Sequence, residues 1–554
     1  MRNTKLFVTF AANKLKFLTM AKRFNTAVTC NPDLHYMVDT TNKMNVFERL
    51  IDDKCYFTIT RARQFGKTSS LKWIYNNLNS KYLVVSISFE DTENENWVSN
   101  ETFYRYFCNN LVNAFKEDEL TKNVENEKFW NDAMQVDKPN FDMLSSKITE
   151  FCKKSPKPIV LLIDEVDKSL DNQLFLTFLS MLRKKYIDRD KRGYNSTFWS
   201  VVLASVYDIK NLKVKLRPDE EHQYNSPWNV AADYDLDMTF NPQEISTMLV
   251  DYENDYHIGF DIKEISEEIY KYTSGYPVLV SWICKEIDEN LGKDWSKDGV
   301  LKAVNKMLKN NEARIFKDII KNIEAYPELK KLLKAVSLEN FKVSYYADNF
   351  PIEIARQFSY IKPDKKSYAQ IHNLIFQQRI NNYYYVQQSL STIDNNGMQS
   401  VYLTKQGDLN MELIIRRFND LMKKRRKSYD QEDENGRTFI EREGRFMFIC
   451  FLKPIINGSG FYYSEPENDD GSRMDLVVTY NSKEYVIELK IWHGTEYEIS
   501  GREQLSGYLA QRGLSEGYLV TFSFLKNKSE QEDPKWIQYD GKRIYEAVIE
   551  CGRE

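Results

Sequence analysis

The fold of the amino-terminal half is decided by the stretch Tyr56-Phe57-Thr58-Ile59-Thr60-Arg61-Ala62-Arg63-Gln64-Phe65-Gly66-Lys67-Thr68-Ser69-Ser70-Leu71. The stretch reads as a β-strand over residues 56–60, a short loop, and a helix that begins at Gly66-Lys67-Thr68. Backbone N–H groups at a helix N-terminus point towards a bound anion, and the helix dipole favours negative charge there. The stretch therefore predicts a phosphate-binding loop.

In such a loop the lysine contacts the β- and γ-phosphates, and the next hydroxyl holds Mg²⁺. These roles fall to Lys67 and Thr68 here. The full pattern G-x-x-x-x-G-K-[ST] has a glycine five residues before Gly66, where this sequence has Arg61. A basic strand–loop–helix that binds no nucleotide is therefore the alternative for the loop alone. The loop residues that we assign to cofactor binding are Gln64, Phe65, Gly66, Lys67, Thr68 and Ser69.

A second motif about 100 residues later supports the interpretation of the loop. Residues 157–165, Lys-Pro-Ile-Val-Leu-Leu-Ile-Asp-Glu, form an apolar run that ends in two acids. This pattern is typical of a central parallel strand, and ligands bind at the carboxyl ends of such strands. Asp164 would hold Mg²⁺ through water, and Glu165 would polarise the attacking water. Taken alone, the run could also be an ordinary strand followed by a helix N-cap.

Further strands are expected over residues 82–89 and 198–204, with helices over 101–153 and about 172–185. Strands that alternate with helices predict an α/β fold with a doubly wound parallel sheet. Ser205 follows the last of these strands, where a polar side chain could sense the γ-phosphate. An ordinary cap at the strand end is the alternative for Ser205.

From Asn241 onward the pattern becomes helical, and Gly275 and Pro277 are expected to end one helix and begin the next. Residues 300–425 read as mixed helix with short strands, such as Tyr-Tyr-Tyr-Val at 383–386. Two basic groups then form a cluster on a helix: Arg416 and Arg417, and residues 423–427. We favour a solvated face or linker for this cluster, and contact with a phosphate backbone is the alternative. The acidic residues 428–435 mark a domain boundary.

The carboxyl-terminal part holds a second candidate catalytic site. A helix is expected over residues 437–452, and a short turn joins two strands at 473–480 and 484–492. The turn can bring Asp475 near Glu488 and Lys490. Because Glu488 and Lys490 are two residues apart, their side chains leave the same face of the strand.

The residue types at this site suit a Mg²⁺-dependent phosphodiesterase. Asp475 and Glu488 are hard oxygen ligands for Mg²⁺, and Lys490 would position or deprotonate water and stabilise charge on the phosphate. Gln504 from the next helix and Glu443 from the first helix could complete the site. The order helix, strand, strand, helix, strand is that of a restriction-endonuclease-like core. A salt-bridged amphipathic hairpin is the alternative.

Composition sets outer limits on the function. The 554 residues carry a net charge of only −4, so bulk charge does not indicate a nucleic-acid binder. The seven cysteines form no C-x-x-C pair, which argues against a zinc site or a disulfide framework and suits a reducing cytoplasm. No stretch approaches the roughly 18 apolar residues that a membrane helix needs, so we expect no membrane contact. The basic residues 1–20 read as an extension upstream of a natural start at Met20.

Taken together, several motifs resemble bacterial AAA-ATPase-like proteins with a C-terminal PD-(D/E)XK nuclease domain. The motifs are His-Tyr-Met-Val-Asp at 35–39, Arg-Ala-Arg-Gln-Phe-Gly-Lys-Thr at 61–68, Leu-Ile-Asp-Glu-Val-Asp-Lys at 162–168, Ser-Pro-Trp-Asn at 226–229, Thr-Ser-Gly-Tyr-Pro at 273–277, Arg-Met-Asp at 473–475, Ile-Glu-Leu-Lys-Ile-Trp at 487–492 and Gln-Leu at 504–505. The family's phosphate loop commonly reads R-x-R-Q/R-F/Y-G-K, so Arg61 is similar to its relatives. Met474 stands where the nuclease motif has proline.

The resemblance implies nucleotide binding, with ATP favoured over GTP, through Lys67 and Thr68, and Mg²⁺ through Asp164. It also implies a nuclease-like site at Asp475, Glu488 and Lys490 that acts on DNA or RNA, and roles in defence or mobile elements. The domains expected are an extension at 1–24, a P-loop AAA-ATPase-like domain at 25–240, a helical lid at 241–300, a helical or winged-helix-like connector at 301–430 and a nuclease-like domain at 431–554.

Two functions from different classes follow. The first is an ATP-dependent switch that gates a Mg²⁺-dependent nuclease in the same chain. The second is a nucleotide-dependent regulator that binds nucleic acid or a partner protein and has an inactive nuclease core. A scaffold in which both sites are relics is a third alternative. A cytoplasmic location is expected, and a homo-oligomer stays open.

Overall fold

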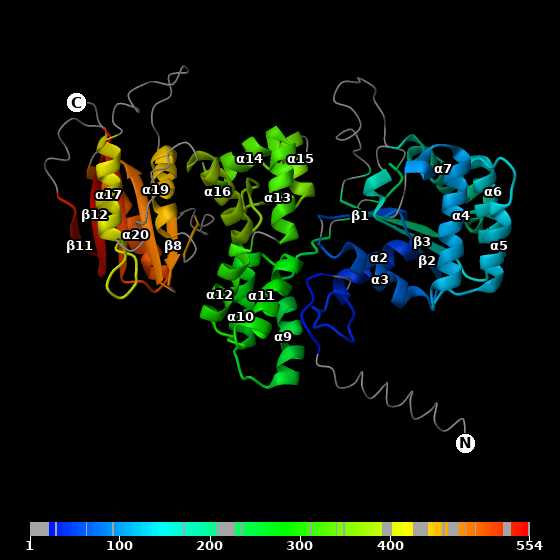
Figure 1. The fold of residues 1–554 in the computed structure, drawn as a ribbon, viewed down its shortest axis with the longest axis horizontal. Coiled ribbons are helices and arrows are strands. Elements are labelled where there is room, and N and C mark those ends of the chain that lie inside the picture. The colour runs from blue at the N-terminus through cyan, green and yellow to red at the C-terminus, as the bar shows by residue number, and fades with distance from the viewer. Residues whose placement is uncertain are drawn as a thin grey trace, which may run out of the picture. The chain divides into compact units, whose positions relative to one another are not determined.

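The structure is a computed structural model in which the chain divides into two compact units (Figure 1). The N-terminal unit comprises Met1–Tyr270, Ser274–Lys285 and Glu353–Ser359, and the C-terminal unit comprises Lys271–Thr273, Glu286–Ile352 and Tyr360–Glu554. The residues that the structure describes are 22–27, 30–62, 64–90, 94–169, 172–206, 209, 228–232, 234, 236–310, 313–338, 341–346, 349–389, 402–424, 441–456, 460–463, 476–481, 483–492, 495–523 and 533–551.

The N-terminal unit is built on a four-stranded sheet with the order β1-β4-β3-β2. Its strands are β1 (Phe57–Thr60), β2 (Leu83–Ser88), β3 (Ile159–Asp164) and β4 (Ser200–Ser205). All three pairings are parallel, with Ser88 opposite Asp164 and Thr60 opposite Ser205. The predicted doubly wound parallel sheet is therefore confirmed, and its strands end together at one edge of the sheet.

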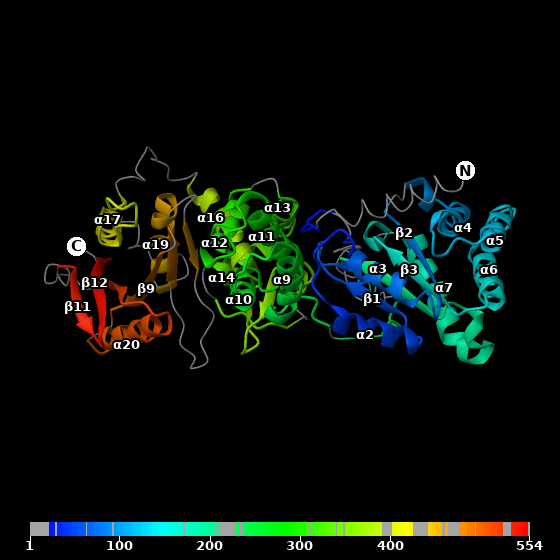
Figure 2. The same cartoon turned by 90° about the horizontal axis from the view of Figure 1, so that it is seen from below.

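Helices cover both faces of this sheet (Figure 2). On one face, α3 (Lys67–Leu78) contacts β2, β3 and β4, and α2 (Thr41–Asp52) stacks Phe47 on Phe57 of β1. On the other face, alternate strand residues such as Val85, Leu161 and Leu203 share one apolar cluster with helices α4 to α7. These helices are α4 (Asn100–Glu117), α5 (Val124–Met134), α6 (Phe141–Lys154) and α7 (Gln173–Arg192), and the short 3₁₀ turns nearby are η1 (Asn94–Trp97), η2 (Val166–Ser169) and η3 (Tyr194–Ser196).

The segment after β4 returns along the outer edge of β1. The backbone N–H of Ala232 donates to the Tyr56 carbonyl at 2.7 Å. The indole N–H of Trp228 donates to the Thr58 hydroxyl at 2.9 Å, and the Tyr234 hydroxyl donates to the Thr58 carbonyl at 2.9 Å. Because β1 pairs with β4 on its other side, residues 228–232 and Tyr234 cover an edge that would otherwise lack partners.

The segment predicted as a helical lid begins with α9 (Pro242–Tyr256), whose N-terminus is fixed by local contacts. Asn241 and Glu244 form a reciprocal capping box, and Pro242 occupies the first helical turn, where its missing N–H costs nothing. Helix α10 (Ile262–Thr273) ends before Gly275, and α11 (Pro277–Asn290) begins at the next proline. The expected helix end and helix start at Gly275 and Pro277 are therefore confirmed.

One expectation in the connector region is wrong. Residues 383–386, predicted as a strand, lie in helix α16 (Leu374–Ser389). Phe376, Ile380 and Tyr384 are all buried at a spacing of four residues, so burial of one helical face outweighs the β-preference of tyrosine and valine. The other elements of this region are α12 (Lys297–Lys309), α13 (Arg314–Ala325), α14 (Pro327–Ser337), α15 (Phe350–Gln357) and a hairpin of β5 (Ile361–Pro363) and β6 (Ala369–Ile371).

The C-terminal unit ends in a six-stranded mixed sheet with the order β11-β12-β10-β9-β8-β7. β7 (Gly460–Tyr463), β8 (Leu476–Tyr480) and β9 (Lys483–Ile491) form an antiparallel meander. β10 (Glu516–Ser523) pairs parallel with both β9 and β12 (Lys542–Glu550), and β11 (Lys535–Tyr539) closes the edge. The expected helix–strand–strand–helix–strand order is present, with β7, β11 and β12 in addition.

Helices lie on both faces of this second sheet as well (Figure 2). α20 (Thr495–Gln511) contacts β9 and β10, and its Leu505 and Leu509 pack over Gly517. α19 (Glu441–Ile456) packs on the opposite face, where Gly444 leaves room for the ring of Phe522. α17 (Met411–Lys424) contacts β12. Within the described parts of the chain, every helix is too short or too polar to span a bilayer.

Candidate functional site

The phosphate-binding loop has the shape that an anion needs. Gly66, the residue before α3, takes a φ of 82°, a left-handed conformation that glycine adopts without strain. Among the described residues, no side chain caps the N-terminus of α3, and the first turn of this helix holds no acid. The N–H groups of this turn are therefore turned towards the space in front of the loop, where a phosphate would be their acceptor.

Lys67 is held by the loop itself. Its side chain is only 7% exposed, and its ammonium group donates to the carbonyl of Arg61 at 3.1 Å and is 3.4 Å from that of Ala62. Neutral carbonyl oxygens are weaker partners for an ammonium group than phosphate oxygens are. Lys67 is thus placed at the loop in a position that a nucleotide phosphate could take over.

Thr68 and Asp164, 96 residues apart in the sequence, meet in the structure. The Thr68 hydroxyl donates to Asp164 Oδ2 at 2.8 Å, and Asp164 Oδ1 accepts the backbone N–H of Glu165 at 2.8 Å. A hydroxyl and a carboxylate at this spacing are the donor set by which P-loop proteins hold Mg²⁺, with phosphate and water as the other ligands. The residues present therefore fit the ion.

Glu165 has an unusual backbone and a perturbed carboxyl group. Its φ of 54° is rare outside glycine, and such strained residues cluster at functional sites. Burial raises the pKa of Glu165 above its ordinary value, and the carboxylates of Asp164, Asp167 and Glu90 raise it further, whereas Lys67 lowers it. A carboxyl group that is easier to protonate is a stronger base once it is deprotonated.

Ser205 is fully buried, and its hydroxyl donates to Asp167 Oδ1 at 2.7 Å. The same oxygen accepts the backbone N–H of Val206 at 2.7 Å. Asp167 therefore fixes the end of β4 beside the Asp164-Glu165 pair. Sequence reasoning assigned no role to Asp167, although its place two residues after Glu165 was a usable signal.

The remaining loop residues differ in their surroundings. Gln64 is exposed, and Ser69 is half-buried. Phe65 is 4% exposed and packs edge-on against Tyr276, with ring centroids 4.7 Å apart. Phe65 thus contacts the corner between α10 and α11.

The close packing at this corner requires a glycine at position 275. Gly275 has a φ of 71°, and a Cβ atom there would lie 1.9 Å from the carbonyl oxygen of Phe240. The backbones are this close because the Phe240 N–H donates to the Gly275 carbonyl at 2.8 Å. No side chain larger than hydrogen fits without moving one of the two segments.

We expect Gly275→Ala to destabilise the protein by about 3 kcal/mol or more, because a left-handed φ and a backbone clash add together. Gly259→Ala is the matched control, since Gly259 has a φ of 83° and open space around it. The control should cost only about 1–2 kcal/mol. Urea unfolding monitored by circular dichroism measures both, and equal losses for the two variants would contradict the steric argument.

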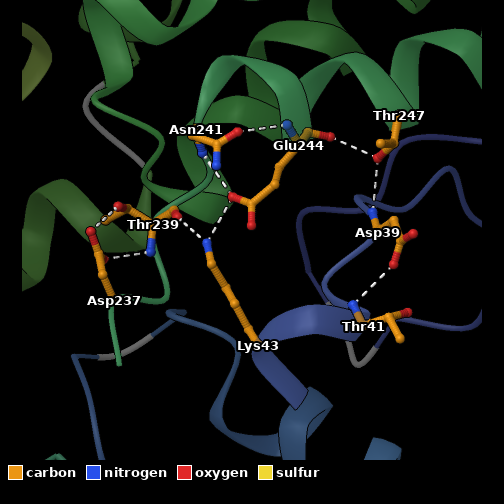
Figure 3. A network of polar contacts seen from close by, with 8 residues as sticks. All are labelled: Asp39, Thr41, Lys43, Asp237, Thr239, Asn241, Glu244 and Thr247. Atoms are coloured by element: carbon orange, nitrogen blue, oxygen red, sulfur yellow. Dashed lines mark hydrogen bonds and ion pairs between the residues drawn. The ribbon is translucent and has the colours of Figure 1, made fainter. Parts of the chain in front are cut away.

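A polar network joins α2 and the residues before it to α9 and the residues before that helix (Figure 3). The ammonium group of Lys43 on α2 donates to the Thr239 carbonyl at 2.5 Å and to the Glu244 carboxylate on α9 at 2.7 Å. Nearby, the backbone N–H of Asp39 donates to the hydroxyl of Thr247 at 2.9 Å. The Lys43 and Glu244 side chains are 15% and 17% exposed, so this ion pair is better shielded from solvent than ordinary surface pairs.

In the C-terminal sheet, the structure brings Glu488 and Lys490 together. The Lys490 ammonium group lies 2.8 Å from Glu488 Oε1, and the two side chains are 20% and 1% exposed. Both face α20, since a Cβ atom on Gly501 would lie 3.5 Å from Lys490 Cγ. Gln504 lies on the same helix, one turn after Gly501.

Two further predicted site residues are not placed beside this pair. Asp475 lies outside the described residues, although Leu476, the residue after it, pairs with Ile487, the residue before Glu488. Glu443 lies near the start of α19, whose described contacts are on the other face of the sheet, and its side chain is not among those described. The roles of Asp475 and Glu443 stay predictions.

The described part of the basic cluster is engaged within the C-terminal unit. Arg416 donates to the hydroxyl of Tyr545 at 3.3 Å, and Lys423 pairs with Glu550 at 2.8 Å. Arg417 approaches Asp420 at 3.5 Å. The contacts of Arg416 and Lys423 join α17 to β12, whereas the Arg417–Asp420 pair lies within α17. Residues 425–427 of the cluster lie outside the described residues.

Comparisons with solved structures give distant similarities. A Walker-type ATPase of Pyrococcus abyssi matches with a TM-score of 0.45 and 11% identity, covering 64% of this chain and 99% of that one. The ORC2 protein of Aeropyrum pernix, solved as ADPNP–ADP complexes, matches with a TM-score of 0.36 and 10% identity over 64% and 94% of the two chains. The Holliday junction branch migration motor RuvB of Thermotoga maritima matches with a TM-score of 0.31 and 13% identity over 63% and 95%.

No curated protein sequence matches the chain. The model of one protein family, described as the AAA-like domain, matches residues 27–345. This range is more than half of the chain, and it contains the phosphate-binding loop, the Asp164-Glu165 pair and the lid corner at Gly275. The chain therefore belongs to the AAA-like domain family, and its N-terminal unit has the architecture of a P-loop ATPase.

Proposed function

We propose that the N-terminal unit binds ATP with Mg²⁺ and hydrolyses it. The N–H groups at the start of α3 and the Lys67 ammonium group hold the phosphates, and Thr68 and Asp164 hold the ion. When bound, Mg²⁺ neutralises part of the charge that develops on the phosphates. Glu165 accepts a proton from the attacking water. Ser205, whose hydroxyl donates to Asp167, is the residue that we assign to sensing the γ-phosphate.

The observation that carries this proposal is the 2.8 Å contact between Thr68 and Asp164, next to a helix N-terminus that no side chain caps in the described part of the chain. A thermal melt with and without ATP and Mg²⁺ tests it, because a ligand that binds only the folded state raises the melting temperature. At 100 times Kd we expect the N-terminal unit to melt about 5 °C higher. An unchanged melt at millimolar ATP and Mg²⁺ would show that the loop does not serve this ligand.

Glu165→Gln should abolish the pH dependence that the raised carboxyl pKa creates. The folded protein keeps a proton on Glu165 at pH values where the unfolded chain has lost it, so this group's stabilising contribution is present at low pH and lost as pH rises through the folded pKa. We therefore expect Glu165→Gln to melt higher than the wild type at pH 8, with a difference that shrinks towards pH 4. ATP turnover should fall with the same substitution. A melting difference that grows towards low pH would contradict the assignment.

We also propose that the C-terminal unit is a Mg²⁺-dependent nuclease that acts on DNA or RNA and is gated by the nucleotide state of the first unit. Support comes from the element order α19-β7-β8-β9-α20-β10, and from the ion pair of Glu488 and Lys490 on the face of β9 next to α20. When bound, Mg²⁺ stabilises charge on the scissile phosphate. Glu488, with Asp475, would hold the ion, and Lys490 would orient the attacking water. Gln504 and Glu443 are the candidates to complete the site.

The second candidate function is a nucleotide-dependent regulator whose nuclease core is inert. The observation that favours it is the direct ion pair of Glu488 with Lys490, which is also what a purely structural pair would form. Incubation with plasmid and oligonucleotide substrates, with Mg²⁺ or Mn²⁺ and with or without ATP, separates the two functions. Cleavage supports the nuclease, whereas ATP binding without cleavage of any substrate supports the regulator, whose partner would be nucleic acid or protein. Size-exclusion chromatography with light scattering tests for a homo-oligomer.

A further inference from the structure

Arg61 stands where the common phosphate-loop pattern has its first glycine, and it makes contacts that glycine cannot make. Its guanidinium group donates to the carbonyls of Thr60, at 2.6 Å, and Leu236. Its backbone N–H donates to the Ser205 carbonyl at 3.0 Å, and its own carbonyl accepts from the Lys67 ammonium group at 3.1 Å. One residue thus touches the end of β4, the phosphate-binding lysine and the segment that leads to the lid.

The backbone at this position does not require glycine. Gly66 and Gln64 take positive φ values in this loop, whereas Arg61 is not among the described residues with a positive φ. An L-residue at 61 is therefore accommodated without backbone strain. The side chain is free to serve another purpose.

The role of the Arg61 side chain is indicated by the described residues that precede the lid segment. Residues 228–232 and Tyr234 follow the edge of β1 through hydrogen bonds to Tyr56 and Thr58. The Arg61–Leu236 contact continues this path past the end of β1 into the phosphate loop. Four residues later, Phe240 donates to the Gly275 carbonyl at the lid corner.

The corner between α10 and α11 contacts the phosphate loop at a second point. Tyr276 follows Gly275 and packs against Phe65, which immediately precedes Gly66. The phosphate loop is therefore held at its first residue by the Leu236 segment and at its last turn by Tyr276. Both contacts belong to the stretch that carries the lid, so a displacement of the lid segment would reach the loop at both ends.

We propose that Arg61 is a positioning residue that couples the lid segment to the phosphate-binding loop, so that the loop is competent only while the guanidinium group is seated on the Leu236 carbonyl. The proposal rests on the proposed nucleotide binding at Lys67. The coupling acts through the Arg61 carbonyl, because any shift of residue 61 moves the oxygen that accepts from the Lys67 ammonium group. A glycine at position 61 would leave the start of the loop without these side-chain hydrogen bonds, whereas the arginine side chain holds it in place.

The test is to restore the common glycine. We expect Arg61→Gly to weaken ATP binding by roughly 10- to 100-fold, because a charged hydrogen bond to the half-buried Leu236 carbonyl is lost and the loop is released. The effect should appear mainly in the KM for ATP, with a smaller change in kcat. Arg61→Lys, which keeps a donor, should recover part of the affinity. Isothermal titration with ATP and Mg²⁺, together with steady-state turnover, gives these values.

The matched control is Arg189→Ala, which removes another guanidinium-to-carbonyl contact, to Lys54 at 2.6 Å, outside the phosphate loop. It should lower the melting temperature without changing ATP affinity. Arg61→Met keeps the aliphatic stem and serves if the glycine variant does not fold. Unchanged or tighter ATP binding by Arg61→Gly or Arg61→Met would overturn the positioning role while leaving ATP binding intact. A wild-type protein that binds no ATP would overturn both.

Discussion

Replacing Lys67 by alanine is expected to lower ATP turnover by at least about 100-fold, because the loop loses an ammonium group that would stabilise charge on the β- and γ-phosphates. Binding should weaken as well, since the N–H groups of α3 and the Thr68–Asp164 pair remain but the compensating positive charge is gone. Water can satisfy the two loop carbonyls that accept from this ammonium group once the side chain is removed. Phosphate release under saturating ATP and Mg²⁺ is the measurement.

Lys72→Ala is the matched control for this variant. Lys72 lies on the same helix, one turn further along, and is exposed. Its removal takes away one positive charge of the same kind without touching the loop, so turnover should stay within about twofold of wild type. If Lys67→Ala retains wild-type turnover while Lys72→Ala does the same, the phosphate-binding loop has been assigned to the wrong stretch.

Replacing Glu488 by glutamine is the second change with a large expected effect. Glutamine keeps the size of the side chain but removes the negative charge that would hold Mg²⁺ and pair with Lys490. We expect cleavage of DNA or RNA to fall by about 100-fold or more, while the melting temperature changes little because the amide oxygen can still accept from Lys490. Fluorescently labelled oligonucleotides with Mg²⁺ provide the assay.

Glu516→Gln controls for the loss of a carboxylate from the same sheet. Glu516 begins β10, is 43% exposed and pairs with Arg543 at the surface. Cleavage by this variant should match the wild type. Undiminished cleavage by Glu488→Gln would remove this residue from the active site and return the Glu488–Lys490 pair to a structural role.

The sequence predicted those parts of the fold whose signal is local. Residues 159–163 are apolar without interruption because β3 is buried on both faces, so the run identified the strand and the two acids at its end. The Gly66-Lys67-Thr68 sequence identified the start of α3 because this signal is also local. The glycine that takes a left-handed conformation directly precedes the first residues of the helix. The meeting of Thr68 with Asp164 followed from the parallel topology alone.

Other parts depended on signals that were weak or overlooked. β11 and β12 flank Asp540-Gly541, two positive-φ residues whose sequence is a strong hairpin signal. The role of Arg61 was not predictable, because its partner Leu236 lies 175 residues away and depends on the path of the chain after β4. The tyrosine run at 383–386 was misread because side-chain preference is a weak guide when a helical face can be buried.

Coverage of β1 by residues 228–234 has a consequence for how the protein can be divided. A polypeptide ending shortly after β4 would keep every phosphate-binding residue, yet it would expose a row of unpaired main-chain groups along its outermost strand. Such a strand recruits strands from other molecules, so the shortened protein would self-associate and precipitate. The smallest autonomous ATPase fragment must therefore extend beyond Tyr234, well past the last residue that touches the nucleotide in the proposed site.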